Sequence, residues 1–188
     1  MKMNNQEKAL FVLEKLKEML LLSNPTYSFY TGDLLNSNDV SKLIIADYLL
    51  RWVEEIAQYT RLFIIKGNHD LMSRNQNNTL WQYDFDSSFW DELSSIDNVC
   101  YLPKEPSYED NHIYVSSIDL PFEYYENPTG KEDFNLLLRN VEMNKQFLSD
   151  LPNDKLKVLL CHSAKFLTNP EILSYLKEFD VFLSGHFH

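Results

Sequence analysis

The stretch Gly67-Asn68-His69-Asp70 decides the fold of this chain, and only Lys66 separates it from the apolar run at 62–65. Three other polar clusters follow mostly apolar runs in the same way: Thr31-Gly32-Asp33 after 27–30, His162 after 158–161, and Gly185-His186-Phe187-His188 after 181–183. Such runs, bounded by Gly or Asn and separated by helical patterns, favour buried strands of α/β units, although periodicity alone also allows short buried helices. Ligands of such sheets collect beyond the carboxyl ends of the strands, so we expect all four clusters at one edge.

These clusters are rich in side chains that bind divalent metal ions. Asp and Asn offer oxygen ligands, and His offers an imidazole nitrogen. A mixed set of this kind suits a hydrolytic metal centre and differs from the all-thiolate sites of structural zinc. Each residue alone is also a common turn or surface residue, but the four clusters together at strand ends favour metal ligands. The pattern therefore predicts a metal-dependent hydrolase.

Taken in order, Gly-Asp, Gly-Asn-His-Asp, a single His after a strand and Gly-His-X-His resemble the motifs of the calcineurin-like metallophosphoesterase superfamily. The resemblance runs from about Gln6 to His188. It implies an α/β fold, a layered α/β/β/α sandwich, in a single domain over residues 1–188. It also implies hydrolysis of phosphoesters by two divalent metal ions, which would be Mn, Fe or Zn.

Carried over by motif position, the resemblance implies five metal ligands and a catalytic pair. The ligands are Asp33, which bridges the two ions, Asn68, His162 and His186, which complete the second metal site, and His188, which belongs to the first. His69 is implied to contact the scissile phosphate and to protonate the leaving oxygen. Asp70 is implied to orient His69 through a hydrogen bond.

One motif of the family has no counterpart here. Family members begin with a strand that ends in Asp-X-His, but the first thirty residues of this chain contain neither Asp nor His. The chain also stops at His188, where family members continue with further strands. From this we expect an incomplete domain with one well-bound metal ion, a weak second site and impaired activity.

Composition narrows the class of substrate. The 188 residues are 44% hydrophobic and 24% charged, which is typical of a soluble globular protein. The net charge is −11, and binding of nucleic acid draws instead on clustered Lys and Arg. Cys100 and Cys161 lack a CxxC spacing and are expected to be reduced thiols of the core. We therefore expect a cytoplasmic protein without a membrane segment that acts on a small phosphoester.

Hydrophobic periodicity predicts helices at 6–22, 40–59, 134–151 and 171–179, and short strands at 99–102 and 113–118. The segment 71–128 is irregular and rich in aromatic residues, which favours core and cap packing over a substrate pocket. His112 is expected to be a surface residue. Lys66 and Arg74 flank the 67–70 loop and are expected to be solvated.

Two other functions compete with the phosphoesterase interpretation. An SbcD-like DNA nuclease shares these motifs, but the acidic balance disfavours it. The second alternative is a catalytically inactive protein that binds a single metal ion and serves as a scaffold. The absent Asp-X-His motif favours this alternative, whereas the intact His69-Asp70 pair favours catalysis.

Overall fold

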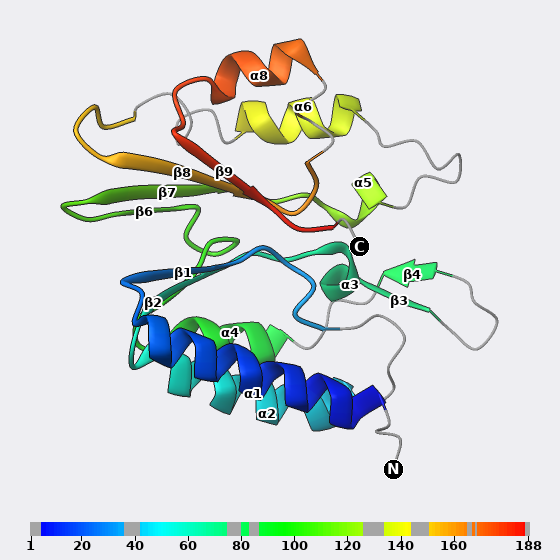
Figure 1. The fold of residues 1–188 in the computed structure, drawn as a ribbon. Helices are drawn as coiled ribbons and strands as arrows, with labels where there is room; N and C mark the ends of the chain where they lie inside the picture. The colour runs from blue at the N-terminus through cyan, green and yellow to red at the C-terminus, as the bar shows by residue number, and fades with distance from the viewer. Residues whose placement is uncertain are drawn as a thin grey trace.

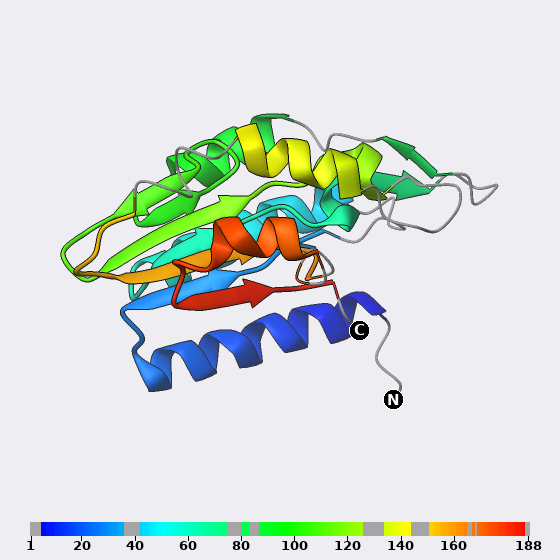
Figure 2. The same cartoon turned by 90° about the horizontal axis from the view of Figure 1, so that it is seen from above.

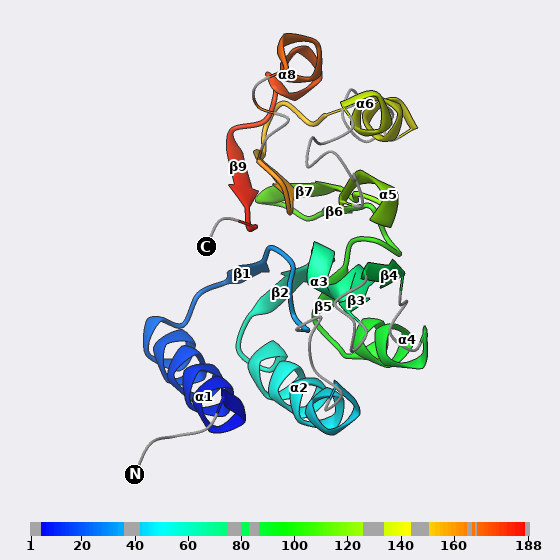
Figure 3. The same ribbon diagram turned by 90° about the vertical axis from the view of Figure 1, so that its right-hand side faces the viewer.

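The computed structural model describes residues 5–35, 42–74, 80–82, 87–125, 134–143, 151–164, 167 and 169–186. Two β-sheets face each other in the middle of the molecule, and helices cover the outer side of each sheet (Figure 1). Seen along the strands, the four layers follow one another from α8 at the top to α1 and α2 at the bottom (Figure 3). The layered α/β/β/α sandwich expected from the sequence is confirmed.

The first sheet has three parallel strands in the order β1-β2-β5, which are β1 (Tyr27–Tyr30), β2 (Arg61–Ile64) and β5 (Val99–Tyr101). Three helices lie on its outer side: α1 (Asn5–Ser23), α2 (Lys42–Ala57) and α4 (Ser87–Ser95). Helix α2 buries Leu49, Trp52, Val53 and Ile56, a spacing of three and four residues that forms one apolar stripe. That stripe packs with Leu62 and Ile64 of the central strand β2.

The second sheet has the order β6-β7-β8-β9, with β6 (Ser107–Glu109), β7 (Ile113–Ile118), β8 (Leu156–Cys161) and β9 (Val181–Ser184). Strand β6 is antiparallel to β7, and the other pairs are parallel. Helices α6 (Phe134–Met143) and α8 (Pro170–Leu176) lie over this sheet (Figure 2). All six residues of β7 are buried, as is usual for a parallel strand covered on both faces.

Apolar side chains fill the space between the two sheets. Phe63 of β2, Val115 of β7 and Leu160 of β8 are completely buried in one cluster. Around Phe63, aromatic rings stack or meet edge to face, with centroids 5.2 Å from Phe29 and 5.3 Å from Tyr108. The two sheets face each other with their parallel strands running the same way, so that the carboxyl ends of all of these strands except the antiparallel β6 share an edge (Figure 1).

Several short elements occupy that edge. Helix α3 (Asn68–Leu71) follows β2 directly, helix α5 (Phe122–Tyr125) follows β7, and the hairpin of β3 (Met72–Arg74) and β4 (Leu80–Gln82) extends beyond them (Figure 1). Helices α3 and α5 contact each other although one comes from the first sheet and the other from the second. The carboxyl-terminal edge is therefore the place where loops of both halves meet.

The predicted helices and strands are present, but some ends differ, and the short elements α3, α5, β3, β4 and β6 were not predicted. Helix α2 ends at Ala57 instead of residue 59. Helix α8 ends at Leu176, three residues before the predicted end, and β5 ends at Tyr101 instead of residue 102. Residues 40–41 and 144–150 of two predicted helices lie outside the described part of the chain. Helix α4 was not predicted, because its buried residues Phe89, Trp90 and Leu93 lie in a segment whose aromatic content obscured the helical spacing.

Two further observations concern the cysteines and the lengths of the helices. Cys100 and Cys161 are buried and form no disulfide. Within the part of the chain that the structure describes, no helix has the length and apolar character needed to cross a bilayer.

Candidate metal centre

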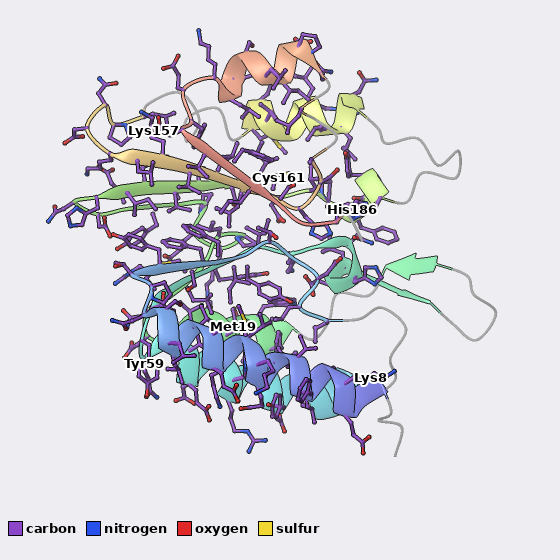
Figure 4. The ribbon with its side chains drawn as sticks, viewed as in Figure 1. Lys8, Met19, Tyr59, Lys157, Cys161 and His186 are labelled. Atoms are coloured by element: carbon purple, nitrogen blue, oxygen red, sulfur yellow. The ribbon has the colours of Figure 1, made fainter. Side chains whose placement is uncertain are left out.

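Residues that follow four different strands meet at the carboxyl-terminal edge. Asp33 comes three residues after β1, Asn68 opens the helix after β2, His162 directly follows β8, and His186 comes two residues after β9. Figure 4 shows His186 at this edge, beside the short helices α3 and α5. Strand pairing explains the meeting, because Cys161 of β8 lies opposite Ser184 of β9. The two histidines therefore leave neighbouring parallel strands at nearly the same level.

The side chains converge to contact distance. Asn68 Oδ1 lies 2.9 Å from His162 Nε2 and 2.8 Å from His186 Nδ1. The two imidazole nitrogens are 3.2 Å apart, and His162 Nε2 is 3.3 Å from Asp33 Oδ2. Neighbouring ligands bound at ~2.1 Å to one metal ion lie about 3 Å from each other. The spacing of these four atoms therefore fits a single divalent ion.

The hydrogen bonds leave lone pairs facing one another at this point. His162 Nδ1 lies 2.7 Å from the carbonyl oxygen of Thr31, which only accepts, so Nδ1 carries a hydrogen. A neutral His162 then directs the lone pair of Nε2 at Asn68 Oδ1. Asp33 Oδ2 is buried and has no hydrogen-bond partner among the described residues. A cation between these atoms, either a proton on Nε2 or a metal ion, would remove the repulsion between the facing lone pairs.

The pKa of His162 is raised and that of Asp33 is lowered, so both shifts favour the charged forms of the two groups. Burial lowers the pKa of His162, but the neighbouring Asp33 carboxylate and the Thr31 carbonyl outweigh it and raise the pKa above the ordinary value. Burial raises the pKa of Asp33, but the neighbouring His162 and the backbone N–H of His69 lower it below the ordinary value. A centre of this kind attracts positive charge.

Backbone conformation makes the close approach possible. Gly32 has φ +97, and Asp33 and His186 have φ +61 and +68, a region that costs non-glycine residues about 1 kcal/mol or more. A Cβ on Gly67 would lie 2.2 Å from Asp33 Oδ1, and one on Gly32 would lie 2.5 Å from His162 Nδ1. Both glycines are therefore required where the backbone of one loop passes the side chains of the others. Strain of this kind gathers at functional sites.

Comparison with known proteins agrees with this geometry. The family model of the calcineurin-like phosphoesterases matches residues 6–188. The chain belongs to this family. No curated protein matches it at a significant level. The membership supports a phosphoesterase-type function in general, and members of this family generally use divalent metal ions.

Asp70 has a clear structural position in this phosphoesterase. Its carboxylate is fully buried and accepts hydrogen bonds from the backbone N–H groups of Gly67 at 2.8 Å, Asp33 at 2.9 Å and Leu35 at 2.8 Å. Burial raises the pKa of Asp70 to about 6, although the N–H donors act in the opposite direction. Asp70 thus ties the loop after β1 to the loop after β2. The predicted hydrogen bond to His69 is not among these contacts, and that role stays a prediction.

His69 lies at the start of α3, beside the carboxylate of Asp33. Its backbone N–H donates to Asp33 Oδ1 at 2.9 Å, which holds one oxygen of Asp33 and leaves Oδ2 directed at His162. The side-chain role predicted for His69 is not tested by this contact.

Three other predicted residues have different positions. His188 lies outside the described residues, so its place relative to the centre stays a prediction. Lys66, expected to be solvated, places its ammonium group 5.0 Å from the ring centroid of Trp90. His112 is exposed in the turn before β7, as expected. Counting only His, Cys, Asp and Glu, the described ranges contain no group of three placed to hold a metal together, so the convergence depends on Asn68.

The candidate metal centre includes groups that the sequence interpretation did not assign. The Thr31 carbonyl fixes the His162 ring, and no sequence signal identifies a carbonyl contact of this kind. The Tyr125 ring lies against His162 and His186, with centroids 6.1 Å and 5.7 Å away. Tyr125 belongs to the aromatic segment in which core packing was favoured over a pocket. The only signal in the sequence for its position is that Tyr125 lies shortly after the carboxyl end of the predicted strand at 113–118.

Proposed function

We propose that the chain hydrolyses phosphoesters at a centre whose metal ligands include Asp33, Asn68, His162 and His186. The observation that carries the proposal is the convergence of their four ligand atoms, with separations of 2.8 to 3.3 Å, one of which is the buried Asp33 Oδ2 that has no hydrogen-bond partner among the described residues. Divalent ions supply Lewis acidity and lower the pKa of bound water, which makes hydroxide available near neutral pH. We further propose that Asp33 is shared by two ions and that His188 belongs to the other ion.

The residues of the chain have distinct tasks in this proposal. Asp33 presents Oδ2, because Oδ1 is held by the His69 N–H. The hydrogen bond between His162 Nδ1 and the Thr31 carbonyl fixes the tautomer and directs Nε2 at the centre. Asn68 Oδ1 lies between the two imidazoles. This arrangement is built before the substrate arrives, and preorganisation of this kind lowers the barrier of the chemical step.

His69 is the proposed general acid. It directly follows Asn68 in the same short helix, and a protonated imidazole there would supply a proton to the departing alkoxide. Without that proton the alkoxide is a poor leaving group. We also propose that Asp70 acts on His69 by fixing the loop, because its three backbone hydrogen bonds set the position of α3.

We propose a small phosphoester as the substrate and a single domain over residues 1–188. The net charge of −11 supports a small substrate over a nucleic acid, since binding to a phosphate backbone draws on clustered cations. The buried, unbridged Cys100 and Cys161 support a cytoplasmic location. No observation among the described residues favours the nuclease.

The test combines metal content with hydrolysis. The protein is loaded with manganese, freed of loose ion and assayed on p-nitrophenyl phosphate and bis-p-nitrophenyl phosphate, with elemental analysis of metal per chain. We expect metal-dependent turnover that chelation removes, and the ratio of the two rates assigns monoesterase or diesterase activity. His162→Gln should reduce kcat/KM on the order of a hundredfold. The matched control His112→Gln changes an exposed histidine far from the centre and should retain full activity.

Two results would overturn the proposal. Turnover that persists after chelation, or in His162→Gln, would show that another site hydrolyses the ester. A protein that holds metal at this centre but hydrolyses neither ester would support the inactive scaffold instead.

A further inference from the structure

Asp119 is a second carboxylate at the same edge of the sheets. It directly follows β7, and Ile118 of β7 lies opposite Cys161 of β8. Asp119 and His162 therefore leave neighbouring parallel strands at the same level. Asp119 Oδ1 is buried and has no hydrogen-bond partner within the described part of the chain. A buried carboxylate oxygen without a donor costs free energy, so packing alone does not account for it.

Tyr125 places a second unpartnered polar atom nearby. Its ring contacts His162 and His186, and its hydroxyl is buried without a hydrogen-bond partner in the described ranges. Tyr125 ends helix α5, which contacts α3, the helix of Asn68 and His69 (Figure 1). The Tyr125 hydroxyl is therefore available to donate a hydrogen bond to a ligand oxygen.

The two groups fit different parts of a phosphoester. Burial raises the pKa of Asp119 to about 6, with the Lys66 charge acting against the rise, so the carboxyl is ionised at pH 8. An ionised carboxylate repels phosphoryl oxygens and accepts hydrogen bonds from O–H or N–H groups. A phenol that touches both histidines of the centre is instead placed to donate to a phosphoryl oxygen. The pair thus offers one hydrogen-bond acceptor and one donor at the carboxyl-terminal edge, where the candidate metal centre lies.

We propose that Asp119 selects phosphoesters whose alcohol carries a hydroxyl or amino group close to the ester oxygen, and that Tyr125 positions the phosphoryl group. This inference rests on the phosphoesterase function proposed above and names its substrate class. A site that hydrogen-bonds a substrate hydroxyl rejects the analogue without it, because the buried carboxylate is then left unpaired. We expect a preference of about tenfold or more.

Binding of two phosphonates tests the proposal without turnover, because their C–P bond is not hydrolysed. Calorimetry of the manganese-loaded protein at pH 8 compares dihydroxypropylphosphonate with propylphosphonate. The wild type should bind the dihydroxy compound about tenfold more tightly. Asp119→Leu removes the acceptor and should bring the ratio of the two Kd values close to one. Tyr125→Phe should weaken both compounds by a similar factor, several-fold, and keep the ratio.

Asp97→Asn is the matched control, because Asp97 is an exposed aspartate in the turn before β5, at the opposite end of the strands. It should keep both affinities. If Asp119→Leu has a strongly lowered melting temperature, Asp119→Asn decides the outcome, since the loss of charge should still reduce the ratio several-fold.

The proposal is overturned if the wild type binds both compounds equally or if the folded Asp119 variants keep the preference. A wild type that hydrolyses p-nitrophenyl phosphate but shows no preference overturns this inference and leaves the proposed function standing. A wild type that binds neither phosphonate and hydrolyses no ester overturns both.

Discussion

The two ends of the sandwich use carboxylates in opposite ways. At the end where β1 and β7 begin, Asp110 accepts hydrogen bonds from the hydroxyls of Tyr27 at 2.8 Å and Tyr108 at 3.0 Å. It also accepts from the backbone N–H groups of His112 at 2.8 Å and Ile113 at 3.0 Å. Because Tyr27 belongs to the first sheet and Tyr108 to the second, Asp110 fastens the two sheets together.

At the carboxyl-terminal end, Asp33 and Asp119 each keep one buried oxygen without a hydrogen-bond partner among the described residues. A satisfied carboxylate stabilises the fold, whereas an unsatisfied one costs free energy that only a ligand recovers. We call the end with Asp110 the closed end and the carboxyl-terminal end with Asp33 and Asp119 the open end. The difference indicates that the closed end stabilises the fold, whereas the open end is arranged to bind a ligand. Three substitutions test this division.

Asp33→Asn should have the largest effect. Asn tolerates the left-handed backbone of this position and still accepts from the His69 N–H, so the fold should persist. The loss of charge should reduce metal-dependent kcat/KM on the order of 10³-fold. It should also abolish the rise in melting temperature that manganese gives the wild type. A variant that melts far below the metal-free wild type would contradict a purely ligating role.

Asp70→Ala tests a carboxylate that lies at the carboxyl-terminal end but, unlike Asp33 and Asp119, has hydrogen-bond donors for both of its oxygens. Removal of the carboxylate leaves three backbone N–H groups without their acceptor, in a position with no exposed surface. We expect the free energy of unfolding to fall by about 3 kcal/mol, measured by urea denaturation of the metal-free protein. Asp33→Asn in the same assay is the control. A loss below about 1 kcal/mol would mean that the loops hold their positions without Asp70.

Asp110→Asn should have the smallest effect, because this group is only half-buried and solvent screens it. Partial burial raises the pKa of Asp110, but the His112 N–H and the Tyr27 hydroxyl outweigh it and lower the pKa to about 2. Since the folded value lies below the unfolded value of about 3.9, its contribution is complete above about pH 4 and is lost as the pH falls toward 2.

We therefore expect Asp110→Asn to cost about 1 kcal/mol at pH 6 and almost nothing at pH 2, measured by urea denaturation at both values. Activity with manganese should stay unchanged, because Asp110 is at the closed end. Equal costs at pH 6 and pH 2 would show that the charge of Asp110 does not hold the two sheets together.

The sequence predicted the elements that pack by a clear period. Strand 113–118 and the helix at 6–22 were recognised because their apolar residues recur at the spacing of a buried strand and an amphipathic helix. Helix α4 escaped prediction because tertiary packing selects Phe89, Trp90 and Leu93 from a segment crowded with other aromatic residues. The family match confirmed the resemblance that the four polar motifs had suggested.

By itself, the sequence determined which polar clusters share an edge, because the carboxyl ends of parallel strands meet there wherever the chain folds as α/β units. Only the tertiary structure decided which atoms face one another. The Thr31 carbonyl fixes the orientation of the His162 ring, and backbone N–H groups donate hydrogen bonds to the Asp70 carboxylate. Asp33 keeps a buried oxygen without a hydrogen-bond partner in the described part of the chain. These differences depend on distances between loops far apart in the chain, and no residue pattern along one strand encodes them.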